Sequence, residues 1–482
     1  MGNGEMVQAW LNRFSLRQPA GLVLAGVLLL VALKQLAWLV VLPLWQTPDE
    51  PAHFHYVQYL AEVHRLPLYT HATPVNTSSE EAAFTERNST LVPVAFHPEN
   101  RATFTRSAFG PGEERLDRGP AMSRINDGNS TAAVYAPAYY FPASLLYRAL
   151  ERSNVLARIF AIRAFSILFV LVTVAAAFFL AGEVWKSLVI RAAFALFVGF
   201  QPMFSMLGVS VNNDAMLIAL ASLALLLLAR QWRQDVAPIG GLAMGALVGL
   251  GMLAKPQMLA FIGIVPAILA YRILLRRASV RQALTYLLGF GAAVALLFSP
   301  WVLYCKHTYG TFLPPLPGEV HPQAVWLGEY LWKFVLQPGT SRLHTLWVVS
   351  HWACFGWLDT VLPDRVYVAL GAMQLLGAVG VVRWVVGNGE GKALAAGSFL
   401  VATAYAAFLY LVEYQLYRAT GSPVLQGRYW LPVVLATSMV TFGGGLTLVN
   451  ERQRVRLAVL MAIAVIALNA ASILRLLERY YA

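Results

Sequence analysis

The chain has 482 residues, of which 58% are hydrophobic and 12% are charged, and its formal net charge is +12. Soluble domains carry about a quarter charged residues, so this composition excludes an ordinary soluble protein and indicates an integral membrane protein. The long apolar runs do not alternate, which favours spanning helices over barrel strands. Excess Lys and Arg are typical of cytoplasmic loops, so nucleic acid is not an expected partner.

The apolar segments predict an all-α polytopic bundle of about 11 transmembrane helices, since about 20 residues cross a bilayer. We expect one domain over 1–482. Lys and Arg gather at every second connection, which predicts a cytoplasmic N-terminus and a C-terminus on the outer side. The predicted spans are 20–44, 157–181, 188–209, 214–230, 238–254, 258–275, 282–304, 363–385, 393–413, 429–449 and 456–475.

The first outer loop, 45–156, opens with the most unusual polar stretch, WQTPDEPAHFHYVQYL. Pro51 suits the first turn of a helix, which places Asp49 or Glu50 at or near its N-cap. Asp49 and His53 lie four residues apart and share a helical face. Charged groups at a membrane boundary usually mark a functional site. The alternative is a capped interfacial helix with no chemistry.

Two segments of this loop are predicted to lie along the membrane interface, Pro51 to Arg65 and Val134 to Leu150, over one cavity that opens outward. Between them, 66–131 is rich in Ser, Thr, Asn, Gly and Pro and predicts an irregular excursion. Tyrosines favour the headgroup level. Anchoring is the favoured interpretation for Tyr135 and Tyr147, whereas anchoring and substrate contact are equally good for Tyr139 and Tyr140.

Several later polar residues fall at outer ends of spans. Asn213 and Asp214 open the fourth span, either as a helix cap or as a second acid facing Asp49. Lys255 follows the fifth span and Arg428 begins the tenth. We favour a shared role for these two cations on one phosphate, with Arg428 binding it by two N–H groups. Lys34 lies inside the first span, where snorkelling outward is the default.

The second large outer loop, 305–362, contains the aromatic stretch WVVSHWACFGWLD at 347–359. An aromatic belt explains most of it, and a wall on which sugars stack would look the same. Cys305 and Cys354 are the only cysteines, and a disulfide is one option if the outer side is oxidising. The sequence has no metal-binding signature, no phosphate-binding P-loop and no GxSxG turn.

Six stretches taken together resemble the GT-C membrane glycosyltransferases, and in particular a branch of bacterial membrane proteins known as DUF2142. They are spread in order over most of the chain. The tyrosine-rich stretch usually begins Pro-Pro, where this chain has Ala136–Pro137. The six stretches are PDEPAHFHYVQYLAE at 48–62, APAYYFP at 136–142, QPMFSMLGVSVNNDA at 201–215, LAKPQ at 253–257, HWACFGWLDTVLP at 351–363 and QGRYWLP at 426–432.

The resemblance implies a glycosyltransferase that moves a sugar from a polyprenyl-phosphate donor to a hydroxyl of a glycan, lipid or protein. The reaction would occur at the outer face of a bacterial plasma membrane. Asp49 matches the family's general base, with Glu50 beside it, and a single displacement would invert the anomeric carbon. The resemblance also makes a divalent cation held by Asp49 and Asp214 possible, although the sequence has no strong ligand set for one. The predicted substrate contacts are His53, Tyr139, Tyr140, Asn213, Asp214, Lys255, His351, Trp352, Trp357, Asp359, Gln426, Arg428 and Tyr429.

Two other classes of function remain open. A transporter of lipid-linked glycans would also need outer polar residues, but it would carry polar groups along several spans. A non-catalytic envelope assembly protein would not need Asp49, Lys255 and Arg428 to converge. The crowding of polar residues at one face favours the enzyme.

Overall fold

The computed structural model describes residues 18–69, 130–232, 236–315, 322–387 and 391–482, and every structural statement below concerns these ranges. Most of the predicted excursion at 66–131 lies outside them. Within these ranges, nine helices are long and apolar enough to cross a membrane, and two further apolar helices are shorter.

All eleven predicted spans have a helical counterpart, so the predicted polytopic bundle is confirmed. The tenth span changes helix type along its length and comprises η7, α18, η8 and α19. The eleven segments are α2 (Pro19–Val41), α7 (Val155–Gly182), α8 (Leu188–Gly199), α10 (Asp214–Gln231), α11 (Pro238–Ala254), η4 (Pro256–Leu259) with α12 (Ala260–Leu274), α13 (Val280–Tyr309), α16 (Asp364–Val386), α17 (Lys392–Thr420), η7 (Gly427–Val433) to α19 (Gly444–Thr447) through α18 (Val434–Ser438) and η8 (Met439–Gly443), and α20 (Glu451–Tyr481).

Local sequence explains where several of these helices begin and end. Ser279 and Gln282 form a capping box at the start of α13, so two otherwise unpaired groups of the first turn are satisfied. Gly310 ends α13 with φ +74°, and Gly421 ends α17 with φ +71°. Glycine adopts this left-handed conformation without a steric penalty.

Glycines bring two pairs of helices into close contact. Added Cβ atoms on Gly241 and Gly245 of α11 would collide with the backbone of Tyr286 and Phe290 on α13. Gly380 of α16 meets the backbone of α19 in the same way. Helices in a membrane associate through close packing and not through exclusion of water, so small residues at these contacts stabilise the bundle.

Lys34 lies inside the bundle, and the prediction that it snorkels outward is wrong. Its ammonium group donates to the Gly199 carbonyl at 2.7 Å, to Ser205 Oγ at 2.8 Å and to Gln35 Oε1 at 3.0 Å. Asn469 of α20 also donates to Ser205 Oγ, at 2.9 Å. These acceptors replace the water that the lysine would otherwise have to reach, and they join α2 to α8, α9 (Pro202–Leu207) and α20.

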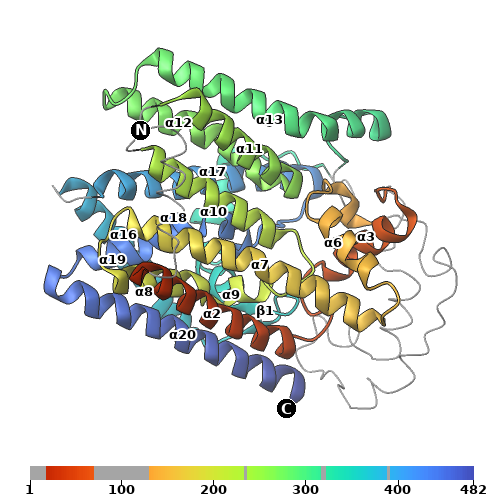
Figure 1. Cartoon of the computed structure of the whole chain (residues 1–482), viewed down its shortest axis with the longest axis horizontal. Coiled ribbons are helices and arrows are strands. Elements are labelled where there is room, and N and C mark those ends of the chain that lie inside the picture. Colours follow the sequence, from red (N-terminus) through yellow and green to blue (C-terminus); the bar gives the residue numbers. More distant parts are fainter. Residues whose placement is uncertain (1–17, 70–129, 233–235, 316–321, 388–390) are drawn as a thin grey trace.

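Two short helices stand at one end of the bundle. They are α3 (Glu50–Val63) and α6 (Tyr140–Ala149), and Figure 1 shows them together at the right-hand end. The C-terminal end of α20 lies at this same end, where the Tyr481 hydroxyl donates to the Val41 carbonyl of α2. The chain therefore begins its first span at one end and finishes its last at the other, as an odd number of spans requires.

Tyr147 is not a headgroup anchor, because its side chain is buried between α3, α6 and α7. Its hydroxyl donates to Glu62 at 2.5 Å and accepts from Gln58 at 3.1 Å. The Arg158 guanidinium lies 4.9 Å from the ring centroid. The predicted anchor is instead part of the polar contact that joins α3 and α6 to α7.

The second large loop, which is predicted to lie on the outer side, consists of short elements between α13 and α16. Cys354 pairs with Val361 across the two-stranded sheet, and Cys354 and Cys305 are both free, buried thiols. Ser130 caps a further short helix, η3 (Thr131–Val134), in the first loop. The elements of the second loop are α14 (Leu327–Leu331), η5 (Trp332–Leu336), η6 (Thr345–Val349), α15 (Ser350–Trp352), β1 (Cys354–Phe355) and β2 (Thr360–Val361).

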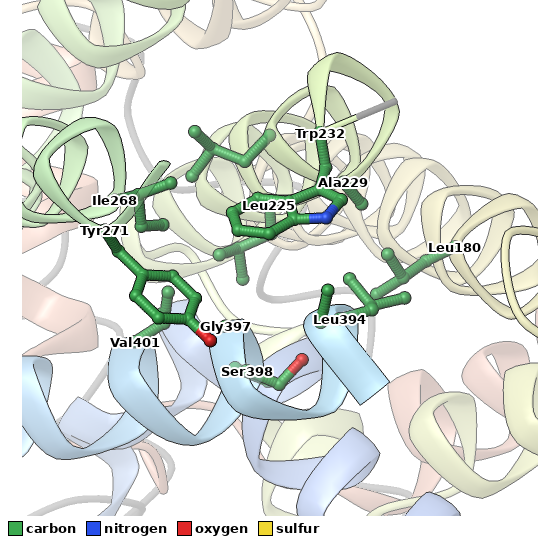
Figure 2. Close-up of a pocket in the computed structure, with 13 residues that line it drawn as sticks. Leu180, Leu225, Ala229, Trp232, Ile268, Tyr271, Leu394, Gly397, Ser398 and Val401 are labelled. Atoms are coloured by element: carbon green, nitrogen blue, oxygen red, sulfur yellow. The ribbon is translucent and has the colours of Figure 1, made fainter. Parts of the chain in front are cut away.

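A small apolar pocket of ≈ 40 Å³ lies at the other end of the bundle. Leu180 near the end of α7, Leu225 of α10 and Leu394 of α17 form part of its wall. Figure 2 shows Trp232, Tyr271 and Ser398 around it. Its lining residues include no Asp, Glu, Lys, Arg or His.

Candidate functional site

The loop between α2 and α3 is held by a buried ion pair. Glu50 accepts two hydrogen bonds from the Arg163 guanidinium of α7, at 2.7 and 2.6 Å, and both side chains are 0% exposed. Arg163 also donates to the carbonyls of Leu42 and Pro43, and Glu50 accepts from the Val211 amide at 3.0 Å. This network joins the end of α2, the start of α3 and the turn before α10.

Asp49 occupies the N-cap position of α3 in a left-handed conformation, with φ +68°. Its side chain makes no capping hydrogen bond, so the interpretation of Asp49 as a mere helix cap loses its main support. Its Oδ2 lies 3.0 Å from Nη2 of Arg428, and the Asp49 side chain is 55% exposed. Strained residues with an open, charged side chain concentrate at functional sites.

The pKa of the Asp49 carboxyl lies below its ordinary value. Burial acts to raise this pKa, but the nearby Arg428, His53 and Lys255 outweigh it, and Arg428 contributes most. Asp49 is therefore a carboxylate at neutral pH. The charge of Arg428 is the main reason that this pKa is lowered.

Arg428 is almost fully buried at the start of η7, and its side chain is 2% exposed. Its Nε and Nη1 groups make no hydrogen bond of normal geometry to the described residues, although Tyr429 lies beside the guanidinium. The preceding Gly427 is fixed by the second outer loop. Its amide donates to Ser350 Oγ at 2.8 Å, and a Cβ there would collide with the backbone at Leu346 and His351.

A second ion pair lies beside the first. Lys255 Nζ lies 2.5 Å from Asp214 Oδ1, and Asp214 Oδ2 has no hydrogen-bond partner in the described parts of the chain. Asn213 Nδ2 donates to the Ala254 carbonyl at 2.7 Å, which joins the start of α10 to the end of α11. Lys255 lies 5.7 Å and Arg428 lies 5.3 Å from the centroid of the Tyr429 ring, so both cations face the same side chain.

An aromatic stack forms the third side of this cluster. The rings of Tyr135 and Tyr140 lie nearly parallel to the ring of His53, at centroid distances of 5.7 and 5.8 Å, and His53 Nδ1 is 2.6 Å from the Tyr140 hydroxyl. Burial, and next the charge of Lys255, lower the pKa of His53 to about 4, so the imidazole is neutral at pH 7. Tyr135 also covers Lys255, at 5.4 Å.

We call this group the ion-pair cluster; its residues come from five separate segments of the chain. It contains two carboxylates and two cations that compensate one another, with one neutral histidine and two tyrosines around them. The four charged groups interact electrostatically across the pairs as well as within them. Its members are Asp49, His53, Tyr135, Asp214, Lys255, Arg428 and Tyr429.

Three other predicted site residues, Tyr139, His351 and Trp352, make their contacts outside the cluster. The Tyr139 hydroxyl lies 2.9 Å from Ser166 Oγ of α7. Trp352 packs on Phe197 in the core. His351 contacts Gln201 at 3.1 Å and the Gly427 carbonyl at 3.4 Å.

The turn between β1 and β2 contains Trp357 and Asp359, and it lies close to the C-terminal helix, α20. Trp357 Nε1 donates to the Trp45 carbonyl at 2.9 Å, while Asp359 accepts from Thr360 and lies 3.8 Å from Arg479. Gln426, just before Gly427, has a side-chain oxygen with no hydrogen-bond partner within the described ranges.

Sequence reasoning missed two important residues. Arg163 pairs with Glu50. The sequence could have indicated such a role, because a charged residue within an apolar span usually has a specific partner. Tyr135 was interpreted as an anchor, yet it covers both His53 and Lys255. Its stretch has four tyrosines, and their directions depend on how the loop folds.

The donor set does not fit a divalent cation. Asp49 and Asp214 are each paired with a positive side chain, at 3.0 and 2.5 Å. Among the described residues, no three side chains of His, Cys, Asp or Glu gather as a ligand group. A cation between the two carboxylates would have to displace both basic side chains.

The helical bundle with α3 and α6 at one end defines a polytopic membrane protein with the GT-C fold. The chain matches the family described as "Predicted membrane protein (DUF2142)" over residues 30–437, and it belongs to that family. No curated protein matches it in sequence.

The fold is similar to that of the Archaeoglobus fulgidus oligosaccharyltransferase. The structure described as its complex with Zn and sulfate aligns with a TM-score of 0.52 and 12% identity, covering 93% of this chain and 53% of that chain. Its apo form gives the same TM-score and identity. ArnT from Cupriavidus metallidurans in the apo state has a TM-score of 0.48 and 14% identity, covering 91% of this chain and 63% of that chain. This chain thus spans about half the length of the archaeal enzyme.

Proposed function

We propose that this protein is a membrane glycosyltransferase that moves a sugar from a polyprenyl-phosphate donor to an acceptor hydroxyl. The observation that carries the proposal is the ion-pair cluster, in which an open carboxylate stands beside two buried cations. The motif resemblance and the family support it. The fold does so too, because the archaeal protein with the same fold is an oligosaccharyltransferase.

In the proposed reaction, Asp49 is the general base. The acceptor oxygen forms a bond to the anomeric carbon as the bond from that carbon to the phosphate oxygen breaks. The acceptor proton passes to Asp49, and the electron pair of the broken bond leaves with the polyprenyl phosphate. One displacement of this kind inverts the anomeric carbon.

Arg428 and Lys255 stabilise the negative charge of the leaving phosphate. Both are buried, so their charges act at reduced dielectric, where electrostatic stabilisation is strongest. Asp214 holds Lys255, and the neutral imidazole of His53 stands close to Asp49. Tyr135 and Tyr429 offer ring faces on which a sugar could stack.

Glu50 is proposed to position the base. Its carboxylate is saturated by Arg163 and two backbone amides, so it has no capacity left for the acceptor proton. It fixes the turn that holds Asp49 in its left-handed conformation. We propose a similar indirect role for His351, which contacts the carbonyl just before Arg428.

The lipid part of the donor needs an apolar site. A cavity of ≈ 490 Å³ lies among α16, α17 and η8, with Phe399, Ala402 and Val440 in its wall and His351 among its lining residues. His351 links the cavity to Gly427, the neighbour of Arg428. We propose that part of the isoprenoid chain lies there, with its phosphate at the cluster.

We also propose that the ion-pair cluster lies on the outer face of the membrane. Basic residues at the ends of spans opposite the cluster support this orientation, because such residues are retained in the cytoplasm. A periplasm-dependent reporter fused after Ala482 should be active. Activity of a cytoplasm-dependent reporter at the same position would overturn the orientation.

The central test uses the purified full chain and radiolabelled polyprenyl-phosphate sugars with added sugar, lipid and peptide acceptors. We expect transfer to one acceptor class, or slow release of free sugar, by wild type and not by Asp49→Asn. Equal rates for the two proteins would exclude Asp49 as the base. Movement of intact donor across vesicles without sugar release would favour a transporter.

A further inference from the structure

Arg428 contacts the predicted base and is also the predicted ligand of the leaving group. Its Nη2 lies 3.0 Å from Asp49 Oδ2. An arginine binds a phosphate through two neighbouring N–H groups, and each of the two edges that present such a pair includes Nη2. Because Nη2 carries one N–H on each of these edges, a phosphate bound in this way contacts the same nitrogen as Asp49, whichever edge it uses.

The guanidinium of Arg428 has donors left for a phosphate, whereas the neighbouring ammonium group of Lys255 is already paired. Arg428 is almost fully buried, and its Nε and Nη1 make no hydrogen bond of normal geometry to the described chain. The other nearby cation, Lys255, already holds Asp214 at 2.5 Å. Asp49 itself is half exposed, so it can leave the guanidinium and enter water at little cost.

We propose that the donor's phosphate and the Asp49 carboxylate compete for Arg428, so that donor binding releases Asp49 to act as the base. This inference rests on the proposed function. Without donor, the contact with Arg428 stabilises the ionised form of Asp49, and this makes the carboxylate a weak base. With donor, the arginine's charge is shared with phosphate, and the phosphate's own negative charge favours a proton on Asp49.

The competition has a consequence that a simple base would not produce. Coupling between two ligands of one group is reciprocal, so removing the Asp49 charge should strengthen phosphate binding. Asp49→Asn removes that charge and keeps the shape, and asparagine tolerates a left-handed conformation. The variant should lose turnover and yet bind the leaving group more tightly.

The experiment measures the Kd of farnesyl phosphate for the full chain in detergent, by calorimetry, with farnesol as the phosphate-free probe. We expect Asp49→Asn to bind farnesyl phosphate about 5-fold or more tightly than wild type, which is the lower range of typical coupling, with farnesol unchanged. Asp364→Asn is the matched control. Asp364 is an exposed acid at the start of α16, so that variant changes the net charge equally and should leave the Kd unchanged.

The outcomes separate this inference from the proposed function. If Asp49→Asn loses turnover but binds farnesyl phosphate no more tightly than wild type, the base stands and the competition is refuted. Tighter binding by Asp364→Asn as well would assign the effect to net charge and would also refute it. If wild type and Asp49→Asn both bind farnesyl phosphate no better than farnesol, the cluster is not a phosphate site and both proposals fail.

Discussion

Two neighbouring acids of the same turn have opposite environments. Glu50 is 0% exposed, and its oxygens accept two hydrogen bonds from Arg163 and two from backbone amides. Asp49 is 55% exposed and meets its arginine at a single contact of 3.0 Å. The Glu50 carboxylate therefore has all its hydrogen-bonding positions filled. Asp49 and Arg428 both have hydrogen-bonding positions left open.

This difference separates a structural ion pair from a reactive one. A saturated buried pair cannot change partners without a large penalty, so it fixes the backbone. A half-open pair can exchange its partner for a substrate group. The rigid pair therefore holds the turn, and the open pair is free to take part in chemistry one residue away.

The strongest test of this difference between Asp49 and Glu50 is to remove the proton acceptor, Asp49, from the open pair. Asp49→Asn should lower the rate of transfer by about 10²–10⁴, the usual range for a general base, with the fold retained. The measurement is sugar transfer per folded molecule. A rate close to wild type for Asp49→Asn, with Asp214→Asn inactive, would move the base to Asp214.

Disruption of the saturated pair, Glu50 and Arg163, should lower the free energy of unfolding. Arg163→Met leaves the Glu50 charge buried without a partner, so we expect a loss of about 3–5 kcal/mol in unfolding free energy. Thermal unfolding in detergent measures it. Glu50→Gln combined with Arg163→Met should recover part of the loss, and Glu50→Gln should reduce the rate per folded molecule less than Asp49→Asn does. If Glu50→Gln is the more damaging to rate, the two acids have been assigned the wrong way round.

Arg428→Lys tests whether the open pair needs the planar guanidinium. Lysine keeps the charge but cannot offer two parallel N–H groups to one phosphate. Loss of one charge-assisted hydrogen bond corresponds to about 10- to 100-fold weaker donor use, seen in kcat/KM for the donor. Lys306→Arg, at an exposed site near the end of α13, serves as a control for lysine–arginine exchange. An unaffected Arg428→Lys would mean that charge alone suffices.

The pH profile tests whether the base is in its ionised form at neutral pH, as the charges of Arg428, His53 and Lys255 around Asp49 require. The pKa of Asp49 lies below its ordinary value, so the base form is present at neutral pH and is lost only on acidification. The pKa of His53 is about 4, so this imidazole also charges only in acid. Donor kcat/KM should therefore be flat above about pH 5 and fall at lower pH. An acid limb near pH 6.5 would indicate a histidine base instead.

The smallest expected effect is that of chelation. Each carboxylate of the ion-pair cluster already has a cationic partner, so EDTA should change the rate by less than about twofold. Manganese or zinc addition after EDTA provides the check. A large loss with EDTA that the metal restores would show that Asp49 and Asp214 exchange their basic partners for a cation.

The difference between Asp49 and Glu50 is one that the sequence alone does not predict. The motif PDEPAH predicts a helix start and a pair of acids, and the structure confirms the helix start at Glu50. It does not say which acid is open, because that depends on Arg163 and Arg428, which lie 113 and 379 residues away from their partners. Lys34 teaches the same lesson, since its acceptors come from α8 and α9.

The sequence by itself determined the spans, the short helices of the first loop and the end of the bundle where charge gathers. Hydrophobic runs and their interruptions are local properties, and a membrane permits few ways to satisfy the backbone in such runs. Only the tertiary structure decided which carboxylate faces which cation and which tyrosine covers the site. These contacts depend on the relative rotation and depth of helices from distant parts of the chain, and small residues such as Gly241 and Gly380 help to set that packing.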